Sequence, residues 1–257
     1  MAAPTADAAS SDARTSEYAV PALDKAFDVL ELLAERSDGL TQSEIAEATG
    51  RSVGQLFRVL STLEARGWIL RERASGLYFF SMAAFDLAHR YPPLRGLLVA
   101  ATAEMRTLSQ EVRQSCNLSV LDMAAVRVVA QVESPADFGY RVRVGALFPL
   151  ATATGTVLVA EGEPDVRAEL FDRLDPDDVA RLAADGSLRR DDPLQAGITD
   201  LVVPIRDPRG FARAALTVPY VATSFSEFGV ERVLEAAVRA GAAIGDRIRG
   251  SSQTAAR

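Results

Sequence analysis

The chain has 257 residues and a formal net charge of -7, with 28 Lys and Arg against 35 Asp and Glu. This acidic balance excludes a general affinity for polyanions, and the length accommodates two domains, of about 65 and about 150 residues. The single cysteine, Cys116, excludes an internal disulfide, and no stretch approaches the roughly 18 to 20 apolar residues of a membrane span, so we expect a cytoplasmic protein with no membrane partner.

The amino-terminal segment lacks the pattern of a folded element. Residues 1–17 are mostly Ala, Ser, Thr and Asp without periodicity, and no apolar segment of a signal peptide follows, so we predict a disordered tail. The next stretch, Tyr18 to Arg36, predicts a helix that closes the core of the following segment. Its apolar residues recur at helical spacing: Val20, Leu23, Phe27, Leu30 and Leu33.

Residues 40–80 have the pattern of a winged helix-turn-helix. Thr41 with Glu44, and Ser52 with Gln55, form capping boxes that each mark a helix start. The second helix, over 53–66, has a predicted buried stripe of Val53, Leu56, Leu60 and Leu63. Two β-prone runs, 68–70 and 77–80, flank a turn and predict a hairpin wing. We therefore predict a DNA-binding domain over 18–81, although helix-turn-helix patterns also occur in helical domains that bind no nucleic acid.

Charge in this domain differs from that of the whole chain. Between Arg51 and Arg73, five arginines oppose two glutamates, which predicts a local basic patch facing phosphates. With so few cationic contacts per protomer, we expect specific binding to need a dimer that reads two half-sites of a palindromic operator in double-stranded DNA. The predicted DNA-contacting residues are Thr41, Arg51, Ser52, Gly54, Gln55, Phe57, Arg58, Ser61, Arg71 and Arg73.

The reading helix has distinct expected contacts along its exposed face. Gln55 has the groups to bond an adenine edge, Phe57 to contact a thymine methyl, and Arg58 to hold either a guanine or a phosphate. Gly54 lets the start of the helix approach the DNA backbone closely.

The rest of the chain reads as a helical linker and a second domain. Two helix patterns, interrupted at Pro92 and Pro93, fill a linker over 82–113. Over 114–250 the apolar period changes to two, with strands near 118–120, 126–132, 142–144, 201–205 and 214–218, before a last helix from Glu227 to Arg249. This predicts an α+β domain with one mainly antiparallel sheet flanked by helices, and a disordered tail over 251–257. The acidic stretch 161–192 is interpreted as a solvated helical surface.

Catalysis and metal binding lack the residues they need. The only histidine, His89, lies in the linker, and Cys116 fits a small core residue better than a nucleophile. One His and one Cys cannot supply a zinc or iron site, and no phosphate-binding loop is present. We expect no enzyme activity, no cofactor and no metal.

The sequence also resembles a known family. GLTQSEIAEATGRSVGQLFRVLSTLEARGWI resembles the winged-helix segment of the IclR family of bacterial transcription regulators, and CNLSVL, YRVRVG, FPL and TGTVLVA resemble successive segments of its effector-binding domain. The resemblance covers about Tyr18 to Arg249. It implies a GAF-like or profilin-like second domain and an effector-binding and oligomerisation role for 114–250. The effector-binding residues that it implies are Thr152, Ala153, Thr154, Asp200 and Thr217, with Asn117 as a weaker addition.

Three departures concern the pocket. The family usually has a His, Ala, Thr or similar run after Pro-Leu and then Gly-Lys; here one residue is missing, no histidine is present and Thr156 replaces Lys. The stretch before Gly197 is shorter than in the family and lacks most of the loop that ordinarily covers one side of the pocket. Asp200 brings a carboxylate that repels an acid ligand unless an arginine compensates. Thr152 and Thr154 stand at a predicted helix start, where they either favour an anion or act only as an N-cap.

We therefore expect a DNA-binding transcription regulator whose DNA binding is modulated by a small-molecule effector, an organic acid being one candidate. It would act as a homodimer or a dimer of dimers. The alternative is a metabolite-binding or enzymatic α+β domain whose winged helix docks onto another protein.

Overall fold

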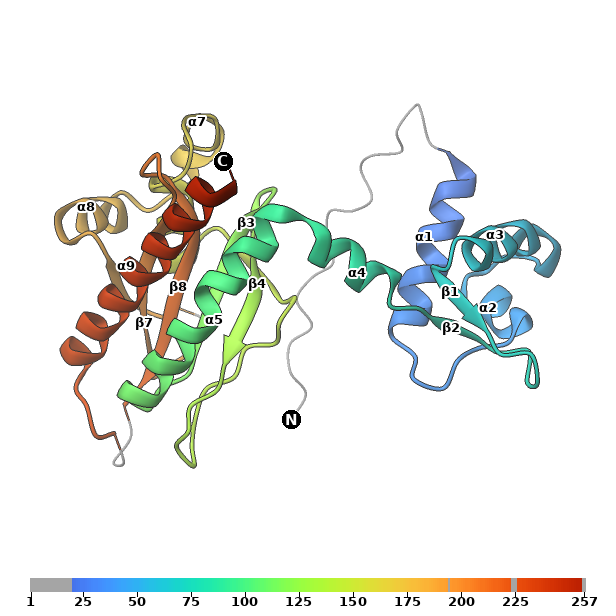
Figure 1. Ribbon diagram of the computed structural model, residues 1–257, viewed down its shortest axis with the longest axis horizontal. Helices are drawn as coiled ribbons and strands as arrows, with labels where there is room; N and C mark the ends of the chain where they lie inside the picture. Colours follow the sequence, from blue (N-terminus) through green and yellow to red (C-terminus); the bar gives the residue numbers. More distant parts are fainter. Residues whose placement is uncertain (1–19, 194, 223–225, 256–257) are drawn as a thin grey trace. The chain divides into compact units, whose positions relative to one another are not determined.

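The chain divides into two compact units, Met1–Tyr91 and Pro92–Arg257 (Figure 1). The computed structural model describes residues 20–193, 195–222 and 226–255. The predicted tail 1–17 lies outside the described residues. None of the described helices is both long enough and apolar enough to cross a membrane.

The first unit is a three-helix domain with a two-stranded wing. Its elements are α1 (Pro21–Ala34), α2 (Gln42–Ala48), α3 (Val53–Ala65), β1 (Ile69–Arg71), β2 (Tyr78–Phe80) and α4 (Ala83–Arg90). Both predicted capping boxes are formed, with the Thr41 and Ser52 side chains accepting from the backbone amides of Glu44 and Gln55. The strands pair antiparallel, which confirms the predicted winged helix-turn-helix.

The buried face of α1 differs from the predicted one. Val29 and Leu33 are buried against α3 and the wing, whereas Val20, Leu23 and Phe27 are more than half exposed. The prediction was therefore wrong for these three, because spacings of three and four fit two neighbouring stripes of one helix and only tertiary packing selects between them. In α3, Leu56, Leu60 and Leu63 are buried as predicted, but Val53 is exposed at the first turn.

The predicted linker joins helices from different units. The helix α4 belongs to the first unit, whereas α5 (Pro92–Val112) belongs to the second and contributes Met105 and Leu108 to its core. Pro92 and Pro93 form the first turn of α5, where a helix does not need their missing amide hydrogens.

The second unit is built on a six-stranded sheet with strand order β5-β4-β3-β8-β7-β6, and every neighbouring pair is antiparallel. This confirms the predicted α+β class. The elements after α5 are β3 (Cys116–Asp122), β4 (Ala125–Val132), β5 (Leu147–Pro149), α6 (Ala153–Ala160), α7 (Pro164–Leu170), the short 3-10 helix η1 (Phe171–Arg173), α8 (Pro176–Asp185), β6 (Leu188–Asp191), β7 (Ile198–Arg206), β8 (Ala212–Val221) and α9 (Val230–Ala255).

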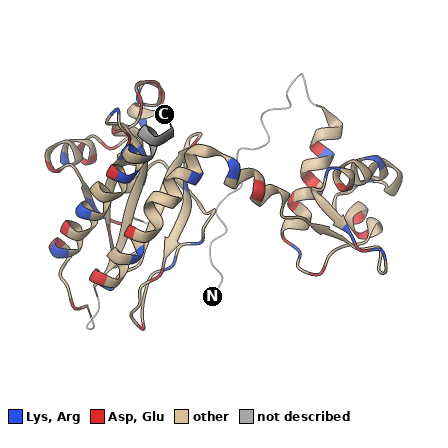
Figure 2. Ribbon diagram, viewed as in Figure 1, with Lys and Arg blue, Asp and Glu red and all other residues tan. Residues whose placement is uncertain are grey.

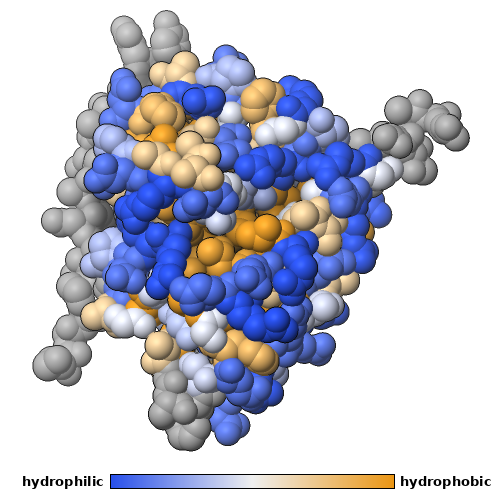
Figure 3. Space-filling view, turned by 90° about the vertical axis from the view of Figure 1, so that its left-hand side faces the viewer, coloured by the Kyte–Doolittle hydropathy of each residue, from blue (hydrophilic) through white to orange (hydrophobic). Residues whose placement is uncertain are grey.

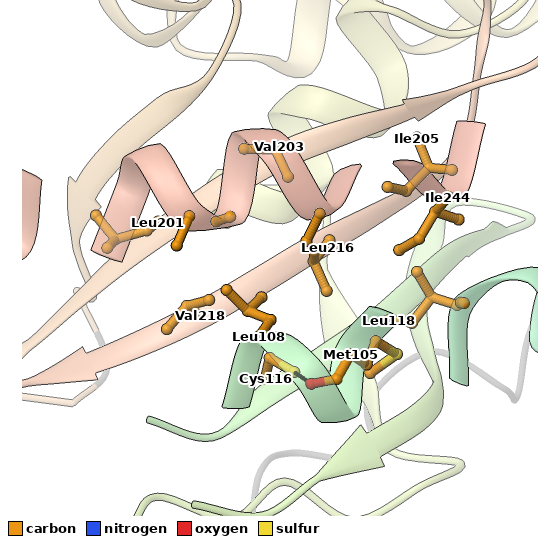
Figure 4. Packing of buried hydrophobic residues seen from close by; sticks show 14 of the residues in the cluster. Met105, Leu108, Cys116, Leu118, Leu201, Val203, Ile205, Leu216, Val218 and Ile244 are labelled. Atoms are coloured by element: carbon orange, nitrogen blue, oxygen red, sulfur yellow. Dashed lines mark hydrogen bonds between the residues drawn. The ribbon is translucent and has the colours of Figure 1, made fainter. Parts of the chain in front are cut away.

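Helices cover both faces of this sheet. On one face α5 and α9 lie side by side and pack on Leu118, Val203 and Leu216 (Figures 1 and 4). On the other face α6, α7 and α8 form a separate core with Val126 and Val202. Because successive strand residues face opposite sides, Asn117 and Ser119 flank Leu118 but point away from α5. The polar residues of β3 are therefore on the α6 side.

Several segments of the second unit differ from prediction. No strand forms at 142–144, because Gly145 turns with φ 89° and the residues before it, 133–143, form a loop without a ladder partner. The edge strand β6 was not predicted, because its sequence, LRRD, lacks apolar alternation. The helix α9 continues through Ala255, into the predicted tail 251–257, since no proline stops it.

The acidic stretch 161–192 is only partly solvated. Figure 3 views the second unit from the side on which α8 lies in Figure 1, and hydrophilic residues there surround a central apolar area. Asp178 of α8 is an exception to the predicted solvated surface, because its residue is fully buried and pairs with Arg181 and Arg190.

Candidate DNA interface and ligand pocket

The exposed face of α3 carries most of the predicted DNA-contacting residues. Phe57 is 61% exposed although it is a large aromatic residue, and Arg58 and Ser61 are exposed beside it. The side chain of Arg58 makes no hydrogen bond or ion pair with another described residue. An exposed aromatic ring next to an uncommitted guanidinium matches the apolar and charged contacts that a DNA-reading helix makes.

The first turn of α3 is rigidly capped. Gln55 accepts a hydrogen bond from the Ser52 amide through Oε1 at 3.2 Å, and its amide NH₂ group bonds no other described residue. Thr41 caps α2 in the same way and bonds the Glu44 carboxylate at 2.7 Å, so Thr41 and Ser52 have structural roles as caps. A Cβ at Gly54 would meet no atom within 4 Å, so the glycine leaves open space at this turn.

The predicted basic residues are not equally available. Arg51 pairs with Asp28 of α1, so its guanidinium ties α1 to the turn before α3. The Arg71 guanidinium lies 5.3 Å from the centroid of the Tyr78 ring. Arg73 is exposed in the loop of the wing, and Figure 2 shows basic positions on α3 and along this loop. Of the predicted basic residues, Arg58 and Arg73 are exposed and make no ion pair or ring contact with another described residue.

A cavity of about 50 Å³ lies in the second unit on the α6 side of the sheet. It is lined by Asn117, Ser119, Val126, Val128, Tyr140, Val142, Phe148, Thr152, Thr154, Asp192, Asp200, Thr217 and Pro219. The structure thus brings together five of the six predicted effector-binding residues from four separate segments. Ala153, the sixth, is buried in α6 and does not line the cavity.

Several lining residues were missed by sequence reasoning. Ser119 is one strand period from Asn117, so the alternation of β3 would have placed both in the cavity. Tyr140 and Asp192 lie in irregular segments whose position depends on contacts distant in sequence, and no local pattern marks them. Arg141 and Arg143 flank the cavity residue Val142 but are exposed, and Arg141 pairs with Glu133 at 3.1 Å.

Hydroxyl groups bond to one another around the start of α6. The Oγ1 atoms of Thr154 and Thr217 are 2.9 Å apart, and either one donates. The Thr152 hydroxyl accepts from the Gly155 amide at 3.1 Å, so Thr152 is the N-cap of α6. Asn117 is 6% exposed, and its Oδ1 accepts from the Ser119 hydroxyl at 3.2 Å.

The charges at the cavity are negative. Burial, with a smaller contribution from nearby Asp192, raises the pKa of Asp200 to about 7, although the Arg190 charge opposes this. Burial, and then the Asp192 and Asp200 charges, raise the pKa of the Tyr140 hydroxyl.

Residues 22–73 match the IclR helix-turn-helix domain, and residues 94–183 match the bacterial transcriptional regulator IclR C-terminal domain.

The chain belongs to the IclR family of transcription regulators. It is 26% identical over 243 residues to the HTH-type transcriptional regulator BhcR of Paracoccus denitrificans, covering 86% of this chain and 85% of that protein. It is 24% identical over 220 residues to KdgR of Escherichia coli, with 79% and 83% covered. An IclR homolog from Microbacterium hydrocarbonoxydans, solved in complex with 4-hydroxybenzoate, superposes with a TM-score of 0.71 at 24% identity, covering 89% of this chain and 99% of that one.

In this IclR-family chain Cys116 is buried, whereas His89 is exposed. Burial raises the pKa of the Cys116 thiol to about 12, and its sulfur donates to the Met105 carbonyl at 3.5 Å (Figure 4). His89 is exposed and stacks on Phe85 within α4. The described residues contain no group of three or more His, Cys, Asp or Glu that could hold a metal ion.

Proposed function

We propose that this IclR-family regulator reads a palindromic operator through α3 and the wing, and that a small-molecule effector in the second unit modulates this binding. The observation that carries the DNA interface is the exposed face of α3, where Phe57 and Arg58 stand beside a capped first turn. Ligand-dependent coupling between two such sites is typically about 1–3 kcal/mol.

The proposed contacts at the DNA differ in what they read. The amide NH₂ of Gln55 reaches a base edge, Phe57 contacts a thymine methyl, and Arg58 holds a guanine or a phosphate. Arg73 and Arg71 contact the sugar-phosphate backbone from the wing, which positions the domain without reading sequence. Arg51 contributes through its pair with Asp28, which holds the turn before α3.

A homodimer is the assembly proposed for operator binding, with a dimer of dimers as its extension. Its support is the apolar stripe of α1, where Val20, Leu23 and Phe27 are 52%, 55% and 57% exposed and follow one another at helical spacing. Contiguous exposed apolar residues on a helix are typical of a contact with another chain. A second copy of the same stripe gives the self-complementary contact that a two-fold dimer needs.

The cavity beside α6 is the proposed effector site. It combines an apolar wall with converging polar groups, which is the usual composition of a small-molecule site. The Microbacterium relative was solved with 4-hydroxybenzoate, so members of this fold accept small organic molecules. We propose that effector binding favours one arrangement of the second units in the dimer and that α5, which continues directly from the first unit, transmits it.

Capture of genomic DNA tests the regulator role. Full-length protein is incubated with sheared genomic fragments, and bound DNA is sequenced. We expect a small set of fragments sharing a palindrome, lost in Arg58→Ala and kept in Arg106→Ala, an exposed arginine of α5. Recovery of random fragments would favour the alternative of a winged helix that docks onto another protein, whereas the same set from Arg58→Ala would reject Arg58 as a DNA contact.

A further inference from the structure

The cavity in the second unit has an unusual balance of polar groups. Its uncharged polar residues are Asn117, Ser119, Tyr140, Thr152, Thr154 and Thr217, and its only charged residues are Asp192 and Asp200. No lysine, arginine or histidine of the described chain lines it. A carboxylate ligand would therefore enter a site that already holds two carboxyl groups and no cation.

The nearest arginine is committed elsewhere. Arg190 lies opposite Asp200 across the β6–β7 ladder, but its guanidinium pairs with Asp178 and donates to the Ala151 carbonyl at 2.6 Å. The Asp178 side chain is 1% exposed. Turning Arg190 toward a ligand would leave this buried carboxylate with only Arg181, which is strongly unfavourable. Arg190 is thus committed to Asp178 and Ala151 and does not line the cavity.

The polar groups of the cavity that lack a partner among the described residues include both a hydrogen-bond donor and an acceptor. The Asn117 oxygen is used by Ser119, whereas no described residue bonds its amide nitrogen, so this NH₂ group needs an acceptor. The Asp200 carboxyl makes no hydrogen bond or ion pair with another described residue and accepts a donor when ionised. A hydroxyl group both donates and accepts, so a ligand alcohol can accept from the Asn117 amide or donate to the Asp200 carboxyl. A ligand carboxylate can only accept.

The size of the cavity limits the ligand. About 50 Å³ of the cavity is open to the centre of a water-sized group, so the cavity holds only a few groups of that size. Val126, Val128 and Phe148 supply apolar walls that can contact the carbon skeleton of a ligand.

Resting on the proposed effector function, we propose that the cavity selects a small, neutral, polyhydroxylated compound of about three or four carbons over an organic acid of the same skeleton. The hydroxyls donate to Asp200 and accept from Asn117, and they continue the hydroxyl pair of Thr154 and Thr217.

The ionisation of Asp200 agrees with this selection. With its pKa raised to about 7 by burial, the Asp200 carboxyl carries a proton part of the time at neutral pH. It can then donate to an alcohol oxygen as well as accept from an alcohol hydrogen. A second carboxylate in the cavity would add a like charge, which a neutral alcohol does not.

Matched probes of one skeleton test the selection. Binding of glycerol, glycerate and 2-amino-1,3-propanediol, and of erythritol and erythronate, is measured by titration calorimetry with full-length protein at neutral pH. We expect each polyol to bind at least about tenfold more tightly than its acid, because like charges repel strongly in a partly shielded site. Asp200→Asn should narrow this ratio, whereas Asp165→Asn, an exposed carboxylate of α7, should leave it unchanged.

Three outcomes would overturn the inference. These are an acid that binds the wild-type protein as tightly as its polyol, the amine binding about tenfold more tightly than glycerol, and no binding by any member of the series. Thermal unfolding of each variant shows that it is folded. The genomic capture reports the regulator role separately, so operator capture together with any of these outcomes would reject the ligand class and retain the regulator.

Discussion

Asp200 is the residue of the cavity whose charge changes near neutral pH. Its carboxyl has a pKa of about 7 in the folded protein against an ordinary value of 3.8, chiefly because it is buried. The unfolded chain therefore ionises this group at a lower pH than the folded chain does. The Asp200 carboxyl therefore contributes most to the stability of the folded protein below about pH 4, and this contribution is lost as pH rises through about 7.

Stability measurements test this pKa. We expect the free energy of unfolding of the wild-type protein to fall relative to that of Asp200→Asn between about pH 4 and pH 8, by on the order of 4 kcal/mol. Urea unfolding at several pH values gives both curves. Asp165→Asn should track the wild type, and parallel curves for the wild type and Asp200→Asn would contradict the raised pKa.

Arg58 and Gln55 are expected to contribute differently to DNA binding. If Arg58 holds a phosphate, Arg58→Ala weakens binding to every sequence and lowers the slope of log affinity against log salt by about 1. Gln55→Ala instead relaxes the preference at one base pair, by about 1–3 kcal/mol. Fluorescence anisotropy with the captured operator, its single-base variants and a salt series measures both. Unchanged binding in both variants, with Arg106→Ala as the control, would reject α3 as the reading helix.

At the scale of single elements, the short helix α6 depends on a glycine. A Cβ at Gly155 would lie 2.2 Å from the Leu150 carbonyl oxygen, a separation no real Cβ contact shows. Leu150 precedes the Thr152 cap, so any shift there moves the cavity wall as well. The glycine therefore permits the tight approach of the chain before α6 to its own first turn.

A pair of Gly→Ala substitutions separates this steric effect from helix propensity. Gly155→Ala should lower the free energy of unfolding by at least about 2 kcal/mol, because backbone must move to admit the methyl group. Gly54→Ala, in open space on α3, should raise it by about 0.5–1 kcal/mol while weakening DNA binding if the backbone approaches closely there. Denaturant unfolding measures both, and equal stability of Gly155→Ala and the wild type would contradict the close approach.

The elements that could be predicted are those specified by residues close together in the sequence. The capping boxes of α2 and α3 and the turn of the wing are specified by residues within a few positions, so the sequence predicts them well. The strand β6 and the loop 133–146 depend on partners distant in sequence, and their own residues lack an apolar alternation that matches their structure. The buried stripe of α1 similarly depended on contacts that only the folded domain provides.

The lining residues of the cavity likewise divide into those that could be predicted from sequence and those that could not. Residues in regular elements, such as Thr154 and Thr217, were placed by the family resemblance, and the structure brings their hydroxyls together. Tyr140 and Asp192, in irregular segments, were not predicted. The charge balance of the site was only half visible in the sequence, because the Asp200 carboxylate was evident but the commitment of Arg190 to Asp178 required the fold.

For the whole molecule, the exposed stripe of α1 predicts how the protein assembles on DNA. Phe27→Ser should reduce affinity for the palindromic operator by about tenfold while leaving half-site affinity unchanged, because a weaker dimer loses the linked second contact. Met123→Ser, at a 92% exposed turn of the second unit, is the matched control. Gel-shift titrations with both DNAs measure this, and an equal loss on half-site DNA would point to damage within the domain instead.

With the selectivity proposed for the cavity, the bridge from Arg190 to Asp178 and Ala151 would control it from outside the cavity walls. Asp178 does not line the cavity, yet it pairs with the guanidinium of Arg190, which lies opposite Asp200 across the ladder. We expect Asp178→Asn to release Arg190 and shift the acid-to-polyol ratio toward acids. A change of effector chemistry in a descendant of this protein would then require one substitution in α8 and no remodelling of the pocket.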